Sequence, residues 1–103
     1  MAVKAHTLTL KEKRFNAICG GDNYIVKEQR SDKPYEVGDV MLLIKQTPIE
    51  ITREDGKIEV TYEATDIIQI ARIRNVITEK GLQDGYVLIL LDLVKHIAGN
   101  GYR

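Results

Sequence analysis

Apolar and polar residues alternate along much of this chain, with a period of two that is typical of half-buried β-strands. Other runs are apolar without interruption, which is typical of strands buried on both faces. Together these patterns predict six or seven strands, at 5–10, 23–29, 40–44, 48–52, 57–63, 67–78 and 86–94. The last run is the most apolar, and we expect it to be the central strand.

The period changes after residue 10. Phe15, Ile18 and Cys19 are spaced to share one stripe of an α-helix. Thr9 and Glu12 have the spacing of a capping box, so we expect the helix to begin there.

Gly20 and Gly21 follow this helix and predict its C-terminal end, because glycine adopts the left-handed conformation without steric cost. Phosphate-binding glycines precede a helix, whose N-terminal N–H groups they expose. The position of these two glycines therefore disfavours a phosphate-binding loop.

The residues Asp55-Gly56 lie between two alternating runs and predict a β-hairpin over 48–66. This hairpin is strongly acidic. It could be a solubilising surface that protects a sheet edge, or a surface that docks a protein partner. The candidate contacts for the second interpretation are Glu50, Glu54, Asp55 and Glu59.

Length and composition indicate one globular domain over 1–103, with its core at about 5–95 and a frayed tail at 98–103. The chain has 103 residues, of which 44% are hydrophobic and 29% are charged. No apolar stretch is long enough for a membrane helix, no signal peptide is evident, and there is a single cysteine. We therefore expect a cytoplasmic protein that makes no membrane contact.

The residues with catalytic or metal-binding chemistry are few. Ser31 is the only serine, Cys19 the only cysteine, and His6 and His96 are the only histidines. This spacing matches neither a catalytic triad nor a zinc site. We expect no catalytic residues, metal or cofactor, a structural role for the thiol, and a hydrogen-bonded core or pocket position for His6.

The net charge is zero but is unevenly distributed, with +3 in residues 1–33, −5 in 34–66 and +2 in the remainder. The basic residues could be a solvated helix face or a patch that contacts phosphate groups, to which tyrosines would add stacking surfaces. The candidate ligand-binding residues are His6, Lys13, Lys27, Arg30 and Tyr35.

Four segments resemble, in order, the ASCH group of PUA-like domains, especially its small bacterial and phage members of unknown function. They read HTLTL, KRFNAICGG, YEVGDVMLL and ITEKGLQDGYVLILLDLV and cover roughly residues 5–95. The positions that match the family pattern are Phe15, Ile18, Gly21, Val37, Gly38, Asp39, Gly81, Leu82, Gly85, Tyr86 and Val87.

The resemblance implies a small PUA-like β-barrel of about six strands with one helix packed against it, in a mainly β (α+β) fold. It also implies a cleft between helix and strands that binds RNA or a nucleotide-like ligand. One branch of the family hydrolyses N4-acetylcytidine with a lysine and a threonine just after the helix glycine and a glutamate on a later strand.

The chain departs from the family pattern after the helix. Asn23, Val26 and Glu28 occupy positions where the family has a lysine, a threonine or glutamate, and an arginine; a shift of register would place Lys27 or Gln29 there instead. Neither register restores the catalytic set. The sequence therefore favours a non-catalytic RNA- or nucleotide-binding domain. The alternatives are a phage-type or mobile-element module that binds a host protein through the hairpin, and a nucleoside deacylase.

Overall fold

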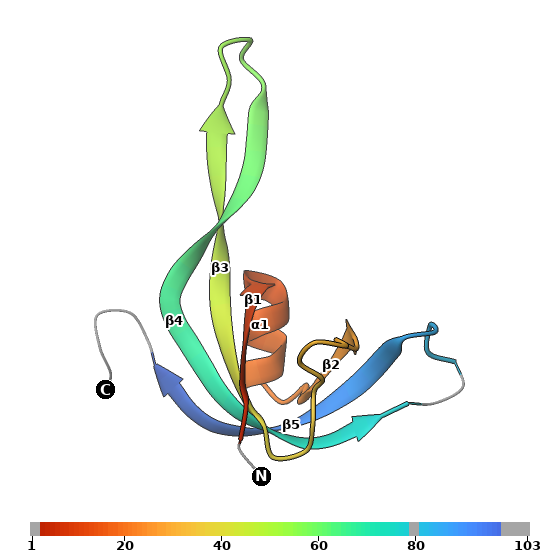
Figure 1. Cartoon of the computed structure of the whole chain (residues 1–103). Helices are drawn as coiled ribbons and strands as arrows, with labels where there is room; N and C mark the ends of the chain where they lie inside the picture. The colour runs from red at the N-terminus through yellow and green to blue at the C-terminus, as the bar shows by residue number, and fades with distance from the viewer. Residues whose placement is uncertain (1–2, 79–80, 98–103) are drawn as a thin grey trace.

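The computed structural model describes residues 3–78 and 81–97. The elements in chain order are β1 (Ala5–Lys11), α1 (Glu12–Cys19), β2 (Tyr24–Glu28), β3 (Val40–Thr52), β4 (Ile58–Ile77) and β5 (Tyr86–Ile97). The strands form one mixed sheet in the order β1-β3-β4-β5-β2 (Figure 1). The predicted mainly β, α+β class is confirmed. The tail predicted at 98–103 lies outside the described residues.

The sheet is open, in contrast to the expected barrel of about six strands. β1 pairs in parallel with β3, and β2 pairs antiparallel with β5. β1 and β2 are therefore the two edge strands, and no pairing joins them within residues 3–78 and 81–97. The strand count is five because two predicted breaks are absent: 40–44 and 48–52 belong to one strand, as do 57–63 and 67–78.

β3 continues through residues 45–47, where a break was predicted, and on through Pro48. Pro48 pairs with Tyr62 of β4, while β1 accompanies β3 only as far as Gln46. A proline fits inside a strand when its missing N–H would have pointed to an unpaired edge. The outer side of β3 at Pro48 is such an edge, so the strand loses no hydrogen bond there.

α1 begins later than its sequence suggests. Its N-cap is Lys11, in an extended conformation and without a side-chain cap, because β1 runs directly into the helix. The predicted capping box of Thr9 and Glu12 is therefore wrong. The predicted end is correct: the Gly20 N–H donates to Asn16 O at 2.9 Å, and Gly21 has a φ of 130°, which favours glycine.

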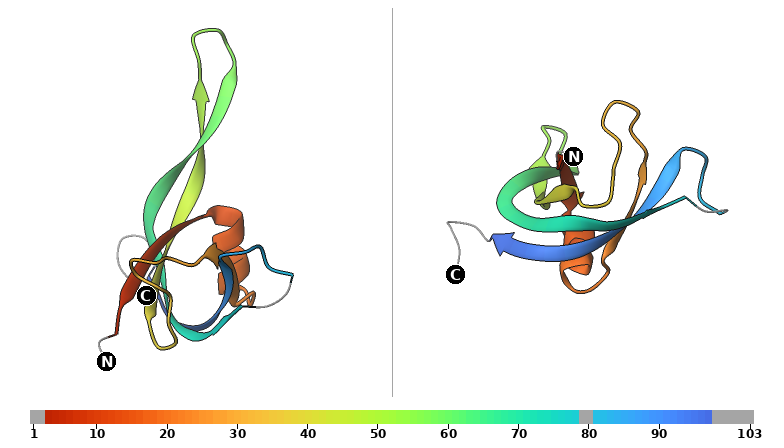
Figure 2. Two further views of the ribbon diagram at one scale, coloured as in Figure 1. Left: turned by 45° about the vertical axis from the view of Figure 1, so that its right-hand side comes forward. Right: turned by 60° about the horizontal axis from the view of Figure 1, so that its bottom comes forward.

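The core lies between α1 and the concave side of the curved sheet, where the two views of Figure 2 place the helix. Phe15 and Ile18 are the buried residues of α1. Burial of such side chains contributes about 1.5–3 kcal/mol each, which fixes the helix on the sheet. The central strand is β4, and not the more apolar β5 as predicted. The remaining buried hydrophobic residues are Ile25, Tyr35, Met41, Leu43, Ala71, Ile73, Val87, Ile89 and Leu91.

The distal half of the β3–β4 hairpin projects away from the rest of the molecule (Figure 1). We call residues 47–66 the arm. All side chains from Glu50 to Ala64 are exposed. The predicted Asp-Gly turn is confirmed, since Gly56 has a φ of 82° and donates its N–H to Arg53 O at 2.9 Å.

Candidate functional site

A cleft lies between the two edge strands of the sheet. One wall comes from β1, and the other from β2 and the loop that follows it. We call it the β1–β2 cleft. Its volume is about 500 Å³, which is within the range of sites for small ligands. The cleft is lined by Thr7, Leu8, Lys27, Glu28, Gln29, Arg30, Ser31, Asp32 and Tyr35.

Gln29 closes the loop that forms one wall of the cleft. Its Oε1 accepts hydrogen bonds from Tyr35 N at 2.8 Å and Arg30 N at 3.1 Å, and its own N–H donates to Gly85 O at 2.7 Å. These bonds tie both ends of the loop to each other and to the start of β5. The loop therefore holds Arg30 and Tyr35 in fixed positions, an arrangement that the sequence analysis did not predict.

His6 and Tyr35 lie together beneath the cleft. Their ring centroids are 4.6 Å apart, and the side chains are nearly inaccessible, with His6 at 3% and Tyr35 at 7% exposure. Tyr35 is consequently part of the cleft floor, with little ring surface free for stacking. The hydrogen-bonded buried position expected for His6 is confirmed by its contact with Asp39, at 2.9 Å between Nε2 and Oδ2.

Asp39 anchors this buried group. Besides His6, its carboxylate accepts from the N–H groups of Lys4 at 3.3 Å and Glu36 at 3.1 Å. Burial alone would raise the pKa of Asp39, but these hydrogen bonds and the Lys4 ammonium lower it below its ordinary value. Since an ionised carboxylate only accepts, His6 Nε2 carries the proton. His6 Nδ1 has no partner within the described residues.

The charges that line the cleft balance. Arg30 makes a two-bond ion pair with Asp32, at 2.8 and 3.2 Å. Glu28 adds a second negative charge to the lining, and Lys27 adds a second positive charge. The ammonium of Lys27 has no hydrogen-bonding partner in the part of the chain that the structure describes. Lys27 is therefore the cation most available to a ligand.

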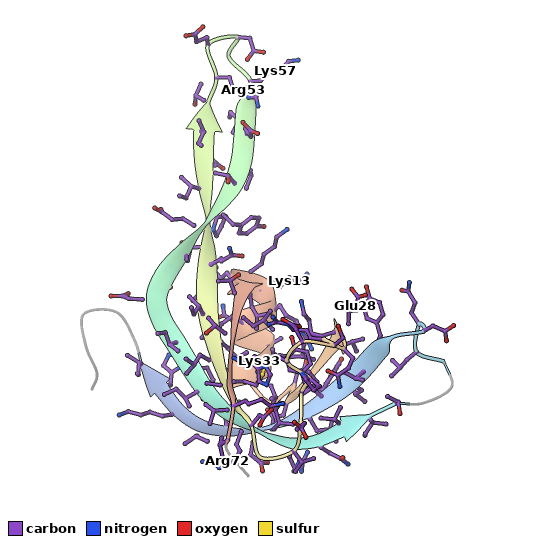
Figure 3. The ribbon with its side chains drawn as sticks, viewed as in Figure 1. Lys13, Glu28, Lys33, Arg53, Lys57 and Arg72 are labelled. Atoms are coloured by element: carbon purple, nitrogen blue, oxygen red, sulfur yellow. The ribbon has the colours of Figure 1, made fainter. Side chains whose placement is uncertain are left out.

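Lys13, the fifth predicted ligand-binding residue, does not line the cleft. It is exposed on α1 and is labelled there in Figure 3. The structure thus brings Lys27, Arg30 and Tyr35 together in one cleft, places His6 beneath them and leaves Lys13 outside. The four acidic residues predicted for protein contact, Glu50, Glu54, Asp55 and Glu59, are all exposed on the arm.

A second polar cluster joins Cys19 to two residues distant in sequence. The thiol donates to Gln69 Oε1 at 3.5 Å, and His96 Nδ1 lies 3.9 Å from the sulfur and 3.3 Å from the same oxygen. Burial raises the pKa of Cys19, and the nearby charge of Lys45 offsets this only in part. A thiol whose pKa is raised is a poor nucleophile. The structural role predicted for Cys19 is therefore favoured over a catalytic one.

Gln69 connects this cluster to the backbone of β4 and β5. Its Nε2 donates to the carbonyls of Ile70 and Lys95, both at 3.0 Å, where the pairing of β4 and β5 shifts register between Ile70 and Ala71. The side chain therefore supplies a donor where the ladder is irregular. No sequence motif marks this residue.

Comparison with known proteins adds no relative: no family model and no curated protein matches the chain. Residues 3–78 and 81–97 contain no helix long and apolar enough to cross a membrane. The same residues contain no group of three or more His, Cys, Asp or Glu side chains placed to hold a metal ion.

Proposed function

We propose that this protein is a non-catalytic PUA-like domain of the ASCH type that binds a nucleoside-like ligand, free or as an unpaired base of RNA, in the β1–β2 cleft. The observation that carries the proposal is the convergence of Lys27, Arg30 and Tyr35 on one cleft of suitable size. The order of the ASCH-like motifs along the chain supports the same assignment.

The charge of the cleft favours the base of a nucleotide over its phosphate. A cleft that recognises phosphate carries excess positive charge, whereas here Glu28 and Asp32 offset Lys27 and Arg30. Neutral donors and acceptors from Thr7 and Ser31 complete the lining. Such a surface suits the hydrogen-bonding edge of a base or a ribose hydroxyl.

The residues after α1 favour binding without catalysis. The family's hydrolytic branch uses a lysine just after the helix glycine, and Asn23 stands at that place here. Loss of a general acid or base costs about two to four orders of magnitude in rate. Release of acetate from N4-acetylcytidine by the wild-type protein, abolished in Lys27→Ala, would instead support the deacylase alternative.

Ligand titrations followed by ¹⁵N–¹H NMR test this proposal. The ligands are the four ribonucleosides, N4-acetylcytidine and a short single-stranded RNA at about 50 mM salt. We expect shifts of the amides of Lys27, Gln29 and Tyr35, and a loss of affinity of at least about tenfold in Lys27→Ala, as expected for one charge-assisted hydrogen bond.

Lys13→Ala is the matched control, because it removes the same charge outside the cleft. Equal losses in both variants would indicate general electrostatic attraction and contradict a specific site. The absence of any shift with every ligand would refute the proposal.

The second candidate function is protein binding through the arm. An isolated two-stranded hairpin is at best marginally stable in water, yet this one carries large apolar side chains that face solvent. Ile51, Ile58, Val60 and Tyr62 are 46%, 65%, 54% and 38% exposed. A partner that covers these residues would account for both the projecting hairpin and its exposed apolar side chains. A surface that served only to keep the protein soluble would need neither.

A further inference from the structure

The arm has a free β-edge. β5 pairs with β4 only from Ile68 onward. On the other side, β3 pairs with β4 from Ala64 to Ile58. Within the described residues, therefore, no strand accompanies the outer side of β4 between Ile58 and Ile67.

The hairpin hydrogen bonds show which backbone groups are unpaired. Arg53 N donates to Lys57 O at 2.8 Å, which makes these two residues a hydrogen-bonded pair. In an antiparallel ladder such pairs alternate with pairs whose N–H and C=O groups point outward. With the observed register, the outward-pointing residues of β4 are Ile58, Val60, Tyr62 and Ala64.

The same residues form an apolar row. Since side chains alternate between faces, Ile58, Val60 and Tyr62 share one face of β4. Near the base of the arm, Lys11 Nζ lies 4.6 Å from the centre of the Tyr62 ring and covers part of it. Beyond that contact the row is open, so an added strand would find apolar neighbours beside an unpaired backbone.

The charge of the arm selects among possible partners. The arm holds six acidic side chains against two basic ones, a net charge of −4. Figure 3 shows the two basic residues, Arg53 and Lys57, at its tip. Arg53 pairs with Glu59 at 2.8 Å, whereas Glu63 has no ion pair within residues 3–78 and 81–97. The middle of the edge therefore carries a carboxylate, that of Glu63, which no basic side chain of the described residues neutralises.

We propose that the outer edge of β4 in the arm binds a basic, extended segment of a partner protein as an added β-strand. The proposal rests on protein binding by the arm and specifies its mode and partner. Backbone hydrogen bonds to Val60 and Tyr62 hold the segment, and its apolar residues pack beside theirs. Its basic residues are matched to Glu63 and to the net charge of the arm. Two arms of this chain would instead repel each other, because each carries a net charge of −4.

The probe is a capped ten-residue peptide in which lysine alternates with valine and threonine, added to the ¹⁵N-labelled full chain at about 50 mM salt. Strand addition protects alternate amides. We expect hydrogen exchange of the Ile58, Val60, Tyr62 and Ala64 amides to slow at least tenfold. The amides of Glu59 and Thr61, already bonded to β3, should change little.

Two matched pairs of variants separate the contributions. Glu63→Lys should weaken binding at least tenfold, and Glu54→Lys, which makes the same charge change in the turn, less than threefold. Val60→Pro removes an outward N–H without breaking a bond to β3, so it should abolish binding. Val60→Ala, which keeps the N–H, should bind within about threefold of wild type.

Three outcomes overturn the proposal. If the peptide does not bind at about 1 mM, the arm is not a site for basic segments, and its proposed protein-binding function also loses its support. If the peptide binds but Val60→Pro behaves like Val60→Ala, the arm binds partners through a side-chain face. In that case protein binding by the arm stands, and only the proposed strand addition is refuted. If sedimentation shows that the chain self-associates through the arm, the occupant is a second copy.

Discussion

Replacing Asp39 with asparagine tests whether the buried carboxylate holds the cleft and the adjoining strands together. The side chain is 5% exposed and accepts three hydrogen bonds, from His6 Nε2 and from the N–H groups of Lys4 and Glu36. Asp39 lies directly before β3. These bonds therefore connect β3 to β1, to the residue that precedes β1 and to the loop that precedes β3. The substitution preserves size and removes only charge and one acceptor.

The magnitude follows from the geometry. Oδ2 accepts from both His6 and Glu36, and Oδ1 accepts from Lys4. An asparagine NH₂ group must face one of these two sets of donors, so at least one bond is lost and the rest lose their charge assistance. If His6 changes tautomer to accept from the amide, its Nδ1–H is left buried without a partner. We expect a loss of about 2–3 kcal/mol in the free energy of unfolding.

The effect should depend on pH with a definite sign. Because the pKa of Asp39 is lower in the folded state than its ordinary value, its stabilisation is complete at neutral pH and is lost as the pH falls through the folded pKa. The difference between wild type and Asp39→Asn should therefore be full at pH 7 and shrink below about pH 4.

Urea unfolding at pH 7 and pH 3 measures both quantities. Glu36→Gln is the matched control: it removes a carboxylate that is 53% exposed and paired with Lys4, and should cost less than about 0.5 kcal/mol. A difference of less than 0.5 kcal/mol for Asp39→Asn at pH 7, or one that persists undiminished at pH 3, would refute this account of the carboxylate.

Three further substitutions or reactions test other parts of the fold. Leu43→Ala, at a fully buried position, should cost about 3 kcal/mol in urea unfolding; a cost below 1 kcal/mol would contradict its core position. Gly21→Ala meets no atom within 4 Å but forces alanine to a φ of 130°, so a purely conformational loss of about 1–2 kcal/mol is expected, and a neutral result would argue against this turn. Cys19 should react with a disulfide reagent at pH 7 more slowly than free cysteine, because burial raises its pKa; faster reaction would indicate an activated thiol.

Local patterns predicted most of the secondary structure because each element has a strong periodic signal. The helix stripe of Phe15 and Ile18 and the turn at Gly56 were both located correctly. The same patterns overcounted strands. The break predicted at 45–47 does not end a strand, because β3 passes through it with a single irregularity in its register with β4.

The strand order could not be predicted from apolar content. The residues of β5 are the most apolar, yet the strand lies beside the edge strand β2 and is covered on its inner face by α1 and the core. β4 is central although its first half is solvated, because its second half pairs on both sides. Pairing partners depend on the path of the whole chain, which local patterns do not encode.

The candidate cleft was predicted in part for a similar reason. Lys27, Arg30 and Tyr35 are close in sequence, so their convergence needed only one ordered loop. Lys13 was included because it is basic and nearby in sequence, but α1 places it outside the cleft. Gln29 was missed because its role is to bond the backbone of its own loop, a task for which no charge or motif is required.

The uneven distribution of charge along the sequence corresponds to separate surfaces in the structure. The acidic excess of the middle third is concentrated on the arm, which shares no residue with the cleft. Within the described residues, β1 joins the two regions, because its Thr7 lines the cleft and its Lys11 reaches Tyr62. β3 joins them as well, because Thr7 pairs with Leu42 of the strand that continues into the arm. Side chains without shared partners contribute nearly additively. A partner on the outer edge of the arm and a ligand in the cleft therefore act on separate surfaces, and any coupling between them has to pass through the sheet, by way of β1 or β3.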